Sequence, residues 1–380
     1  MTKAQKTIWW VVGIVVVVGL IAWGVSRNSG SSNVIKIGFI GPLTGDGAVY
    51  GQPEQNTIEI AVANLNAAGG INGKQVQMIY EDGKCDGQDG TNAAQKLVNV
   101  DGVQAIIGGF CSGETIPAVP VAAAGKVVIL SPGASSPKLT GISPYFFRDY
   151  PSDAAQGDVL ANVAYNTEHY KSVAFIQEET DYAQGIHDSF VPTFEGYGGK
   201  TMLEAFPSDT TDFRSFLTAL RSQNPDALFI DTQTPASTAR ILQQLTQLNW
   251  KPKLLVDDAT SGDPQTLSNY ASQLEGAITA EFLPNASDTA YQAFIQAYHS
   301  KYGQVPPYQN YMACVYDAVN LLAAGIKQVG YDGTALAQWS RTISNWPGAS
   351  GNITIGPDGD RVGGHIPLVI HNGQIVPMAQ

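Results

Sequence analysis

Short apolar runs alternate with helix-like stretches along most of the chain, and this alternation constrains the fold more than any other feature. Apolar runs at residues 34–40, 75–80, 105–107 and 127–130 are separated by segments with helical character. Strands separated by helices are typical of parallel sheets with helices on both faces. The sequence therefore predicts an α/β fold.

The same alternation restarts after residue 148, which predicts a second α/β unit. Its strands are expected at residues 172–177, 201–206, 227–231, 253–257 and 275–282. Helices at 288–302 and 311–328 follow, and an antiparallel hairpin around residues 357–360 is expected near the end. Two units of similar size in a chain of 380 residues predict two lobes with a ligand in the cleft between them.

Two loops in the first unit combine groups that suit a small polar ligand. In the first loop, Ser112 is expected to be the N-cap of a helix that reaches about residue 124. The second loop contains Gly133, Ala134 and Ser135. Loops after adjacent parallel strands lie side by side where such folds bind ligands. Helix-start N–H groups suit an anion, and carbonyl and hydroxyl oxygens suit a cation, so a ligand with both charges is expected.

The N-terminal segment has the character of a membrane anchor. Residues 8–25 carry no charge and follow Lys3 and Lys6. A helix of this length reaches about 27 Å, enough to span a bilayer, and the preceding positive charge places the N-terminus inside. We expect residues 1–7 to be cytoplasmic, 26–33 to be a flexible linker, and the remainder to be extracytoplasmic. A cleaved signal peptide is the alternative.

Charge and motif content exclude several function classes. The net charge is −12 and no basic run occurs, which argues against nucleic-acid binding. The five histidines are dispersed without metal-ligand spacing, and neither a nucleophile elbow nor a Walker loop occurs. We therefore expect no metal, no cofactor and no enzymatic activity, and we expect a monomer.

The chain contains three cysteines. In an exported protein, Cys85 and Cys111 could close a disulfide between adjacent loops or be two unrelated thiols, and the residues alone leave both possibilities open. Cys314 lies on an apolar helix face, so we expect it to be a small buried hydrophobic residue.

Seven motifs occur in the same order as in a known family. They are GFIGPLTGDGAVYG, NAAGGINGKQVQMIYED, GGFCSGETIPA, ILSPGASSPKLT, FRDYPSDAAQG, DFRSFLTALRSQNPDALFI and YDAVNLLAAGI. This set resembles the type I periplasmic binding proteins, and within them the leucine/isoleucine/valine-binding proteins of ABC importers. The resemblance extends from residue 34 to the C-terminus. It implies a two-lobed Venus-flytrap fold in which the chain crosses between the lobes three times. Lobe 1 would comprise residues 34–151 and 282–355, and lobe 2 would comprise 152–281 and 356–380.

The resemblance also implies roles for residues of lobe 1. It pairs Cys85 with Cys111 in a disulfide. Ser112, together with the backbone N–H of Ser135, would bind a ligand α-carboxylate. The Ser135 hydroxyl and the Gly133 carbonyl would face the α-ammonium group.

Across the cleft, the resemblance implies that Asp258 neutralises the ligand ammonium and that Tyr182 covers the ligand when the lobes close. Tyr50 and Tyr311 match positions that line the side-chain pocket. Gln233 stands where leucine-binding relatives carry a tyrosine, which leaves room for a smaller or polar ligand.

The expected function is capture of a small amino acid, either branched-chain-type or polar, and its delivery to the permease of an ABC importer. The alternative is a sensor of an amino acid, an amide or urea that signals to a membrane partner, because the same fold can serve either purpose.

Overall fold

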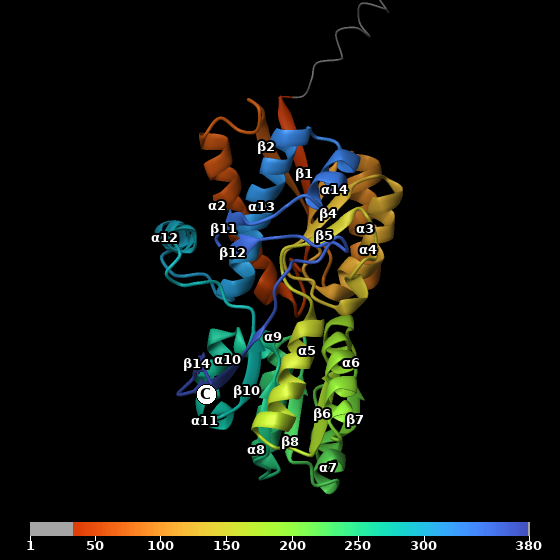
Figure 1. The fold of residues 1–380 in the computed structure, drawn as a ribbon, viewed down its shortest axis with the longest axis vertical. Helices are drawn as coiled ribbons and strands as arrows, with labels where there is room; N and C mark the ends of the chain where they lie inside the picture. Colours follow the sequence, from red (N-terminus) through yellow and green to blue (C-terminus); the bar gives the residue numbers. More distant parts are fainter. Residues whose placement is uncertain (1–32, 379–380) are drawn as a thin grey trace, which may run out of the picture.

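The computed structural model describes residues 33–378, which form two α/β lobes stacked along the long axis of the molecule (Figure 1). The predicted anchor at residues 8–25 and the cytoplasmic end at 1–7 lie outside the described residues. Within residues 33–378, no helix combines the length and the apolar character that crossing a membrane requires.

The first lobe is built on a five-stranded parallel sheet with the order β2-β1-β3-β4-β5. Its strands are β1 (Val34–Gly41), β2 (Gln75–Asp82), β3 (Ala105–Ile107), β4 (Val128–Ser131) and β5 (Phe146–Arg148). Both faces of the sheet are covered, so the central strands are mostly apolar and buried rather than alternating.

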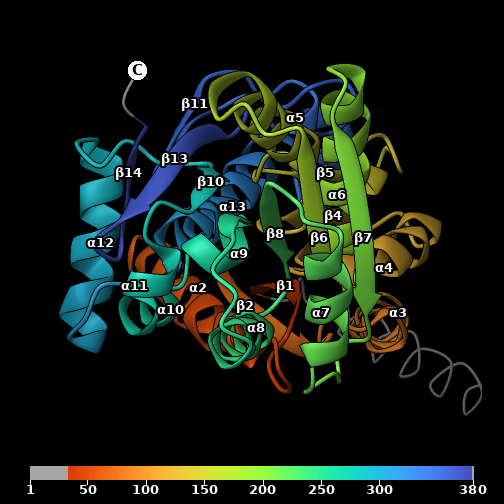
Figure 2. The same cartoon turned by 90° about the horizontal axis from the view of Figure 1, so that it is seen from below.

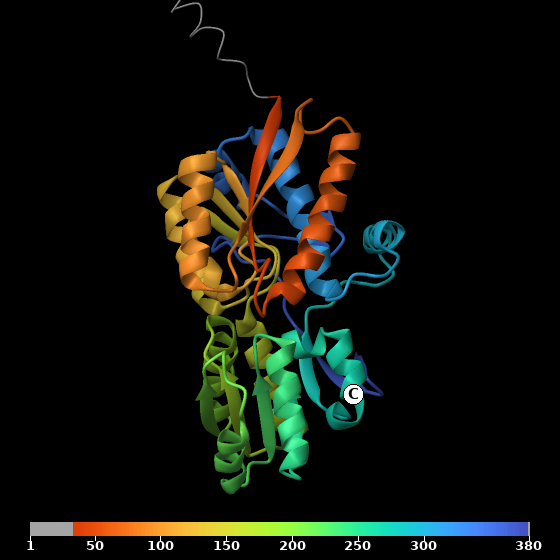
Figure 3. The ribbon, with the colours of Figure 1, turned by 180° about the vertical axis from the view of Figure 1, so that it is seen from behind.

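Helices cover the two faces of this sheet in two groups. Phe39 and its neighbours pack against α2 (Ala48–Ala67), α13 (Gln309–Val329) and α14 (Gly333–Ser340). Figure 3 shows the ribbons of α2 and α13 beside the sheet. On the other face, Ile106 packs against α3 (Gly87–Lys96) and α4 (Ser112–Ala124). The lobe therefore has two apolar cores, one on each side of the sheet.

The second lobe contains a seven-stranded sheet with the order β14-β13-β10-β9-β8-β6-β7. Its strands are β6 (Ser172–Glu178), β7 (Lys200–Phe206), β8 (Ala227–Asp231), β9 (Lys253–Val256), β10 (Ile278–Glu281), β13 (Ile366–His371) and β14 (Gln374–Pro377). The first five are parallel, and β13 and β14 add an antiparallel edge. The sheet is visible from below in Figure 2.

Aromatic and aliphatic residues divide the core of this lobe between the two faces. Phe175 and Phe229 pack against α5 (Asp153–Asn162) and α6 (Asp181–Gly196). On the opposite face, α7 (Arg214–Ser222) and α8 (Pro235–Gln247) bury leucine and isoleucine side chains.

The remaining elements of both lobes are η1 (Leu97–Asp101), η2 (Pro137–Leu139), η3 (Val163–Thr167), α9 (Asp258–Ser261), α10 (Pro264–Asn269), α11 (Ala271–Leu274), α12 (Thr289–Tyr302), β11 (Trp346–Gly348) and β12 (Gly351–Ile353).

The predicted two-lobed α/β architecture is confirmed. The chain passes between the lobes after β5, after β10 and after β12, which gives the three predicted crossings. Because all three run through the same narrow waist, they can act together as a hinge.

The predicted C-terminal hairpin is confirmed only as a short antiparallel turn, and the predicted strands beyond it do not pair with each other. Around residues 357–360 the structure has only one isolated antiparallel bridge, between Ile355 and Arg361. The two hairpins found near the C-terminus pair β11 with β12 and β13 with β14. The strand β13 instead lies against β10, because the edge of the large sheet offers unpaired N–H and C=O groups.

The prediction of Ser112 as a helix N-cap is also wrong. Cys111 occupies the N-cap position with an extended backbone (φ −81°, ψ 144°), and Ser112 is the first residue of α4. The carboxylate of Glu114 accepts hydrogen bonds from the N–H groups of Phe110 and Cys111. A glutamate in the first turn therefore accepts the N–H groups at the start of the helix, and a hydroxyl side chain is not needed as a cap.

Candidate functional site

A cavity of about 30 Å³ lies where the two lobes meet. Six residues singled out from the sequence line it: Tyr50, Ser112, Gly133, Tyr182, Gln233 and Tyr311. Three further lining residues, Phe110, Cys111 and Ala259, were not predicted. The volume is close to that of a single water molecule, so the surrounding side chains must move apart before an amino acid can enter.

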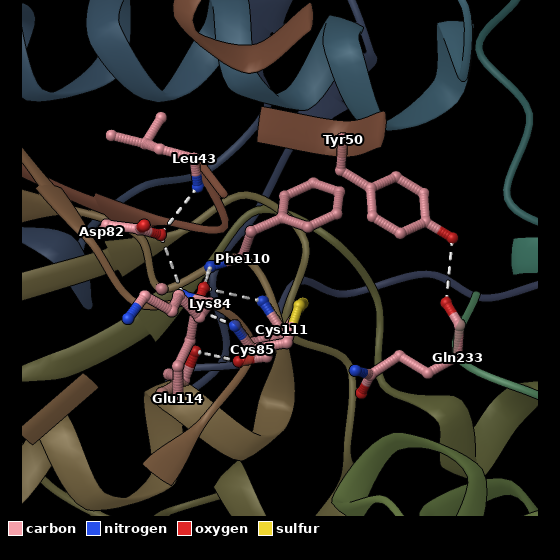
Figure 4. Close-up of a disulfide and its surroundings, with 12 residues drawn as sticks. Leu43, Tyr50, Asp82, Lys84, Cys85, Phe110, Cys111, Glu114 and Gln233 are labelled. Atoms are coloured by element: carbon pink, nitrogen blue, oxygen red, sulfur yellow. Dashed lines mark hydrogen bonds between the residues drawn. A yellow bond between two sulfur atoms is a disulfide. The ribbon is translucent and has the colours of Figure 1, made fainter. Parts of the chain in front are cut away.

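A disulfide and a hydrogen bond fix the start of α4. Cys85 and Cys111 are bonded, with Cα atoms 5.0 Å apart, and Figure 4 shows this bond beside the cavity wall. The pairing implied by the family resemblance is therefore confirmed. Cys314 is buried and free, as predicted. The Ser112 hydroxyl accepts a hydrogen bond from the backbone N–H of Ser136 at 3.1 Å, which ties the first loop to the second.

Glu114 organises the same region from behind. Its carboxylate accepts N–H groups of Phe110 at 2.8 Å, Cys111 at 3.1 Å and Cys85 at 2.9 Å (Figure 4). Burial raises the pKa of Glu114 to about 7, although these hydrogen bonds act in the opposite direction. This carboxylate holds both loops that carry the disulfide.

The second loop is also held by internal hydrogen bonds. The Ser131 hydroxyl donates to the Gly109 carbonyl at 2.7 Å and accepts the Ala134 N–H at 2.9 Å. The fully buried Arg148 donates to the carbonyls of Ala134 and Ser136. These contacts fix the backbone of the loop before any ligand binds.

The Ser135 hydroxyl does not face the cavity as the resemblance implied. It donates a hydrogen bond to Oδ2 of Asp153 at 2.6 Å, and Ser135 is buried. The other oxygen of Asp153, Oδ1, is buried and has no hydrogen-bond partner within residues 33–378. Burial, together with the charge of Asp258, raises the pKa of Asp153 well above its usual value.

Asp258 lies at the centre of a group of tyrosines. It is the first residue of α9, directly after β9, and it is fully buried. Its Oδ2 accepts the hydroxyls of Tyr150 at 2.6 Å and Tyr311 at 2.8 Å, and its Oδ1 accepts that of Tyr182. Tyr150 comes from the first crossing and Tyr311 from α13, so this carboxylate of the second lobe binds groups of the first lobe and of the hinge.

The surroundings of Asp258 favour its ionised form. Burial disfavours the charge of Asp258. The effect of burial is outweighed by His365, whose Nε2 lies 3.8 Å from Oδ2, and by the hydroxyls of Tyr150 and Tyr182. Together they lower the pKa of Asp258 to about 2. A buried carboxylate held in this state can attract a cation.

Asp153, Asp258 and His365 also form a potential metal site. Each offers one ligand atom, and the three atoms lie within 4.8 Å of one another. All three residues are buried. Carboxylate and imidazole groups are suitable ligands for a divalent metal. The tyrosine hydroxyls already occupy much of Asp258, which leaves its carboxylate little capacity to coordinate a metal ion.

Tyr50 and Gln233 meet across the cleft. The Tyr50 hydroxyl donates to the backbone carbonyl of Gln233 at 3.0 Å, and Figure 4 shows the two residues reaching toward each other. The backbone N–H of Gln233 donates to Glu178 at 2.9 Å. The side-chain Oε1 of Gln233 has no hydrogen-bond partner within the part of the chain that the structure describes, so it is free to accept from a ligand.

Sequence reasoning missed several residues of this site. Phe110 and Tyr150 lie inside motifs that resemble the family, so the motifs contained the signal, but neither residue was singled out. Asp153 begins the first helix of the second lobe and reads as an ordinary helix-start acid. His365 comes from the third crossing, more than 100 residues from Asp258, and no sequence pattern connects the two.

Comparisons with known proteins place the chain among binding proteins of the same fold. A family model described as periplasmic binding protein matches residues 34–369. The leucine-, isoleucine-, valine-, threonine- and alanine-binding protein of Pseudomonas aeruginosa is 26% identical over 341 residues, which cover 89% of this chain and 90% of that protein. A leucine-binding protein from Thermotoga maritima superposes with a TM-score of 0.83 at 28% identity, covering 91% of this chain and 98% of that one. A branched-chain amino acid transporter substrate-binding protein from Streptococcus pneumoniae, in complex with isoleucine, gives a TM-score of 0.80 at 26% identity, covering 90% and 97%.

Proposed function

The chain belongs to the periplasmic binding protein family, and on that premise we propose that it captures a small amino acid outside the cytoplasm and delivers it to an ABC importer. One observation carries the proposal: Asp258, a buried carboxylate of the second lobe, accepts the hydroxyls of Tyr182 and Tyr311, and these two tyrosines line the same cavity as Ser112 at the start of α4. A helix start attracts a carboxylate and Asp258 attracts an ammonium group, which together match the two charges of an amino acid.

In this proposal the first lobe receives the ligand while the lobes are apart. The N–H groups at the start of α4, the Ser112 hydroxyl and the Ser135 N–H bind the ligand carboxylate. The loop carbonyls at Gly133 and Ala134 contribute to the ammonium site. Burying both charges is tolerable only when each is paired and hydrogen-bonded, which these groups provide.

Closure of the lobes then completes the site. Asp258 and Tyr182 approach the ammonium group, and Tyr50, Tyr311 and Gln233 surround the ligand side chain. Expulsion of water strengthens each polar contact because the local dielectric constant falls. In the absence of a ligand, tyrosine hydroxyls donate hydrogen bonds to Asp258. Some of these hydrogen bonds must break so that the ammonium group can donate to the same carboxylate.

The relatives support an amino acid as the ligand class. The protein from Pseudomonas aeruginosa is named for binding leucine, isoleucine, valine, threonine and alanine, and the protein from Thermotoga maritima is named for binding leucine. The polar Oε1 of Gln233 at the cavity favours a ligand with a short or polar side chain over leucine. We propose lobe limits of 34–151 with 282–355, and 152–281 with 356–380, and we propose a monomer tethered by residues 8–25.

Calorimetry with the purified protein and each of the twenty amino acids tests the proposal. We expect at least one to bind with a Kd in the micromolar range or tighter, and we expect the double variant Ser112→Ala/Ser135→Ala to lose that binding. The variant Ser272→Ala, which changes an exposed serine of α11, is the matched control and should bind normally. If none of the twenty amino acids, small amides or urea produces heat, amino-acid capture is wrong.

A further inference from the structure

Four of the nine residues that line the inner cavity are aromatic. Tyr50, Phe110, Tyr182 and Tyr311 line it, and the ring centroids of Tyr50 and Phe110 are 5.3 Å apart and those of Phe110 and Tyr311 are 5.4 Å apart. Tyr150 stacks on Tyr311 at 4.4 Å. Aromatic rings attract cations through their quadrupoles, most strongly where water is excluded. The wall therefore favours a positively charged group that has no need of hydrogen bonds.

The hydrogen-bonding capacity of Asp258 is largely used within the protein. An ionised carboxylate offers about four acceptor positions, and three tyrosine hydroxyls donate to this one. A primary ammonium group brings three N–H donors and must compete with these hydroxyls for acceptors. A quaternary ammonium group carries the same charge without donors, so it can lie beside Asp258 while Tyr150, Tyr182 and Tyr311 keep their hydrogen bonds.

The outer part of the cleft selects for positive charge. A larger hollow of about 660 Å³ shares Gln233 with the inner cavity and is lined by acids from both lobes: Asp46, Asp86, Glu178, Glu179 and Asp181. Lys84 is the one basic residue among the described residues that line it. A cleft of one charge sign concentrates ligands of the opposite sign. No lysine or arginine among residues 33–378 lines the inner cavity.

We propose that the ligand is an N-methylated amino acid, with its quaternary ammonium group among the aromatic rings beside Asp258 and its carboxylate at the start of α4. This inference rests on the proposed function and specifies the ligand class of the same site. It adds that methylation of the nitrogen improves binding, because each methyl group removes a donor that Asp258 cannot satisfy and adds apolar surface against the rings.

Calorimetry of the full chain with a methylation series tests this directly. The series is glycine, sarcosine, dimethylglycine and glycine betaine, with choline and benzoate as single-charge probes. We expect affinity to rise along the series, with glycine betaine binding about tenfold or more tighter than glycine. Choline, which lacks the carboxylate, should bind more weakly than glycine betaine, and benzoate should not bind. Valine and trimethylvaline provide the same comparison with a larger side chain.

The outcomes separate this inference from the proposed function. If unmethylated amino acids bind and affinity falls with each methyl group, amino-acid capture stands and the N-methylated class is wrong. If neither series binds but another of the twenty amino acids does, amino-acid capture stands and the N-methylated class is wrong. If nothing binds in either experiment, both proposals are wrong. Choline binding as tight as glycine betaine would contradict the assigned carboxylate contact, and tight benzoate binding would contradict a cation-selective cleft.

Two variants at one position distinguish the ring from its hydroxyl. Tyr311→Phe releases one acceptor position on Asp258, so the preference for glycine betaine over glycine should fall by about fivefold. Tyr311→Leu removes the ring, and glycine betaine affinity should fall by about tenfold. Tyr197→Phe, at a tyrosine that is 41% exposed in the second lobe, is the control and should change neither value. Thermal unfolding and circular dichroism verify folding, and an unchanged preference in both folded Tyr311 variants would overturn the proposal.

Discussion

At the scale of single residues, buried acids determine much of the behaviour of this protein. Asp258 remains ionised because tyrosine hydroxyls and His365 stabilise its charge. Glu114, Asp153 and Asp257 have raised pKa values, with burial as the largest cause in each. The environment of each carboxyl group, rather than its residue type, decides whether it carries charge at neutral pH.

Glu114 predicts a pH-dependent stability. Its pKa rises from 4.5 to about 7 in the folded protein, so the folded protein holds a proton that the unfolded chain releases between these values. The free energy of unfolding therefore falls as the pH rises from 4.5 to 7, by about 3 kcal/mol from this group. In Glu114→Gln this part of the slope should disappear.

Denaturant unfolding at several pH values measures this slope. Glu168→Gln, an exposed change on the second lobe, should keep the slope of the parent protein and serves as the control. A Glu114→Gln variant whose stability changes with pH as steeply as that of the parent would show that other groups cause the dependence.

Site residues differ in how far the sequence could reveal them. The family resemblance points to Tyr50, Ser112, Gly133, Tyr182, Gln233 and Tyr311, and the structure brings all six to one cavity. The hydrogen bond of Ser135 to Asp153 could not be predicted, because it joins the two lobes and depends on their closed arrangement.

At the scale of secondary structure elements, the start of α4 depends on contacts distant in sequence. The disulfide closes a segment with a separation of 26 residues and places Cys111 at the N-cap, directly before Ser112. Local pattern predicted the helix and its approximate end, but not which residue caps it. The capping interaction comes from Glu114, which also binds the loop that carries Cys85.

Loss of this disulfide should reduce both stability and binding. The double variant Cys85→Ser/Cys111→Ser is expected to unfold with a free energy about 3 kcal/mol lower, because closing a loop of this length restricts the unfolded chain. Ligand affinity should also fall, since the start of α4 loses a restraint. Dithiothreitol should destabilise the parent by a similar amount and leave the double variant unchanged; equal sensitivity of the two proteins would contradict the prediction.

The strand β13 shows how tertiary context overrides local pattern. Residues around 357–360 have a turn-forming sequence that predicts a hairpin, yet the following strand pairs with β10. A strand gains more from the edge of a large buried sheet than from a short isolated hairpin.

At the scale of the whole molecule, contacts across the cleft hold the lobes together. The Tyr50 hydroxyl binds the Gln233 carbonyl, and Tyr311 binds Asp258. Such hydrogen bonds favour the closed arrangement before ligand binds, and a ligand that bridges the lobes adds to them.

Removal of one bridging hydroxyl should open the unliganded protein. Tyr50→Phe loses a hydrogen bond of about 1 kcal/mol between the lobes, so the unliganded ensemble shifts toward open forms. Small-angle X-ray scattering should give a larger radius of gyration than for the parent. Tyr298→Phe, which removes a hydroxyl bonded to Asn56 within the first lobe, should leave the radius unchanged. Equal radii for Tyr50→Phe and the parent would contradict this role.

The acidic cleft also predicts how salt affects association. A cationic probe such as choline should associate more slowly as the ionic strength rises, because salt screens the attraction of Asp46, Asp86, Glu178, Glu179 and Asp181. Stopped-flow measurement of the association rate constant checks this. Lys84→Ala should increase the rate at low salt, and a rate that does not depend on salt would indicate that the cleft charge has no part in ligand entry.

The sequence by itself determined the α/β class, the two lobes and most of the strand positions. Hydrophobic periodicity is a local property of the chain, and the number of alternating units follows directly from its length. The family resemblance added the disulfide and six residues of the cavity. Only the tertiary structure decided which groups surround Asp258, since Tyr150, Tyr182, Tyr311 and His365 come from α6, α13 and two different crossings. The charge of a buried carboxylate depends on neighbours in space, and no local pattern in the chain records them.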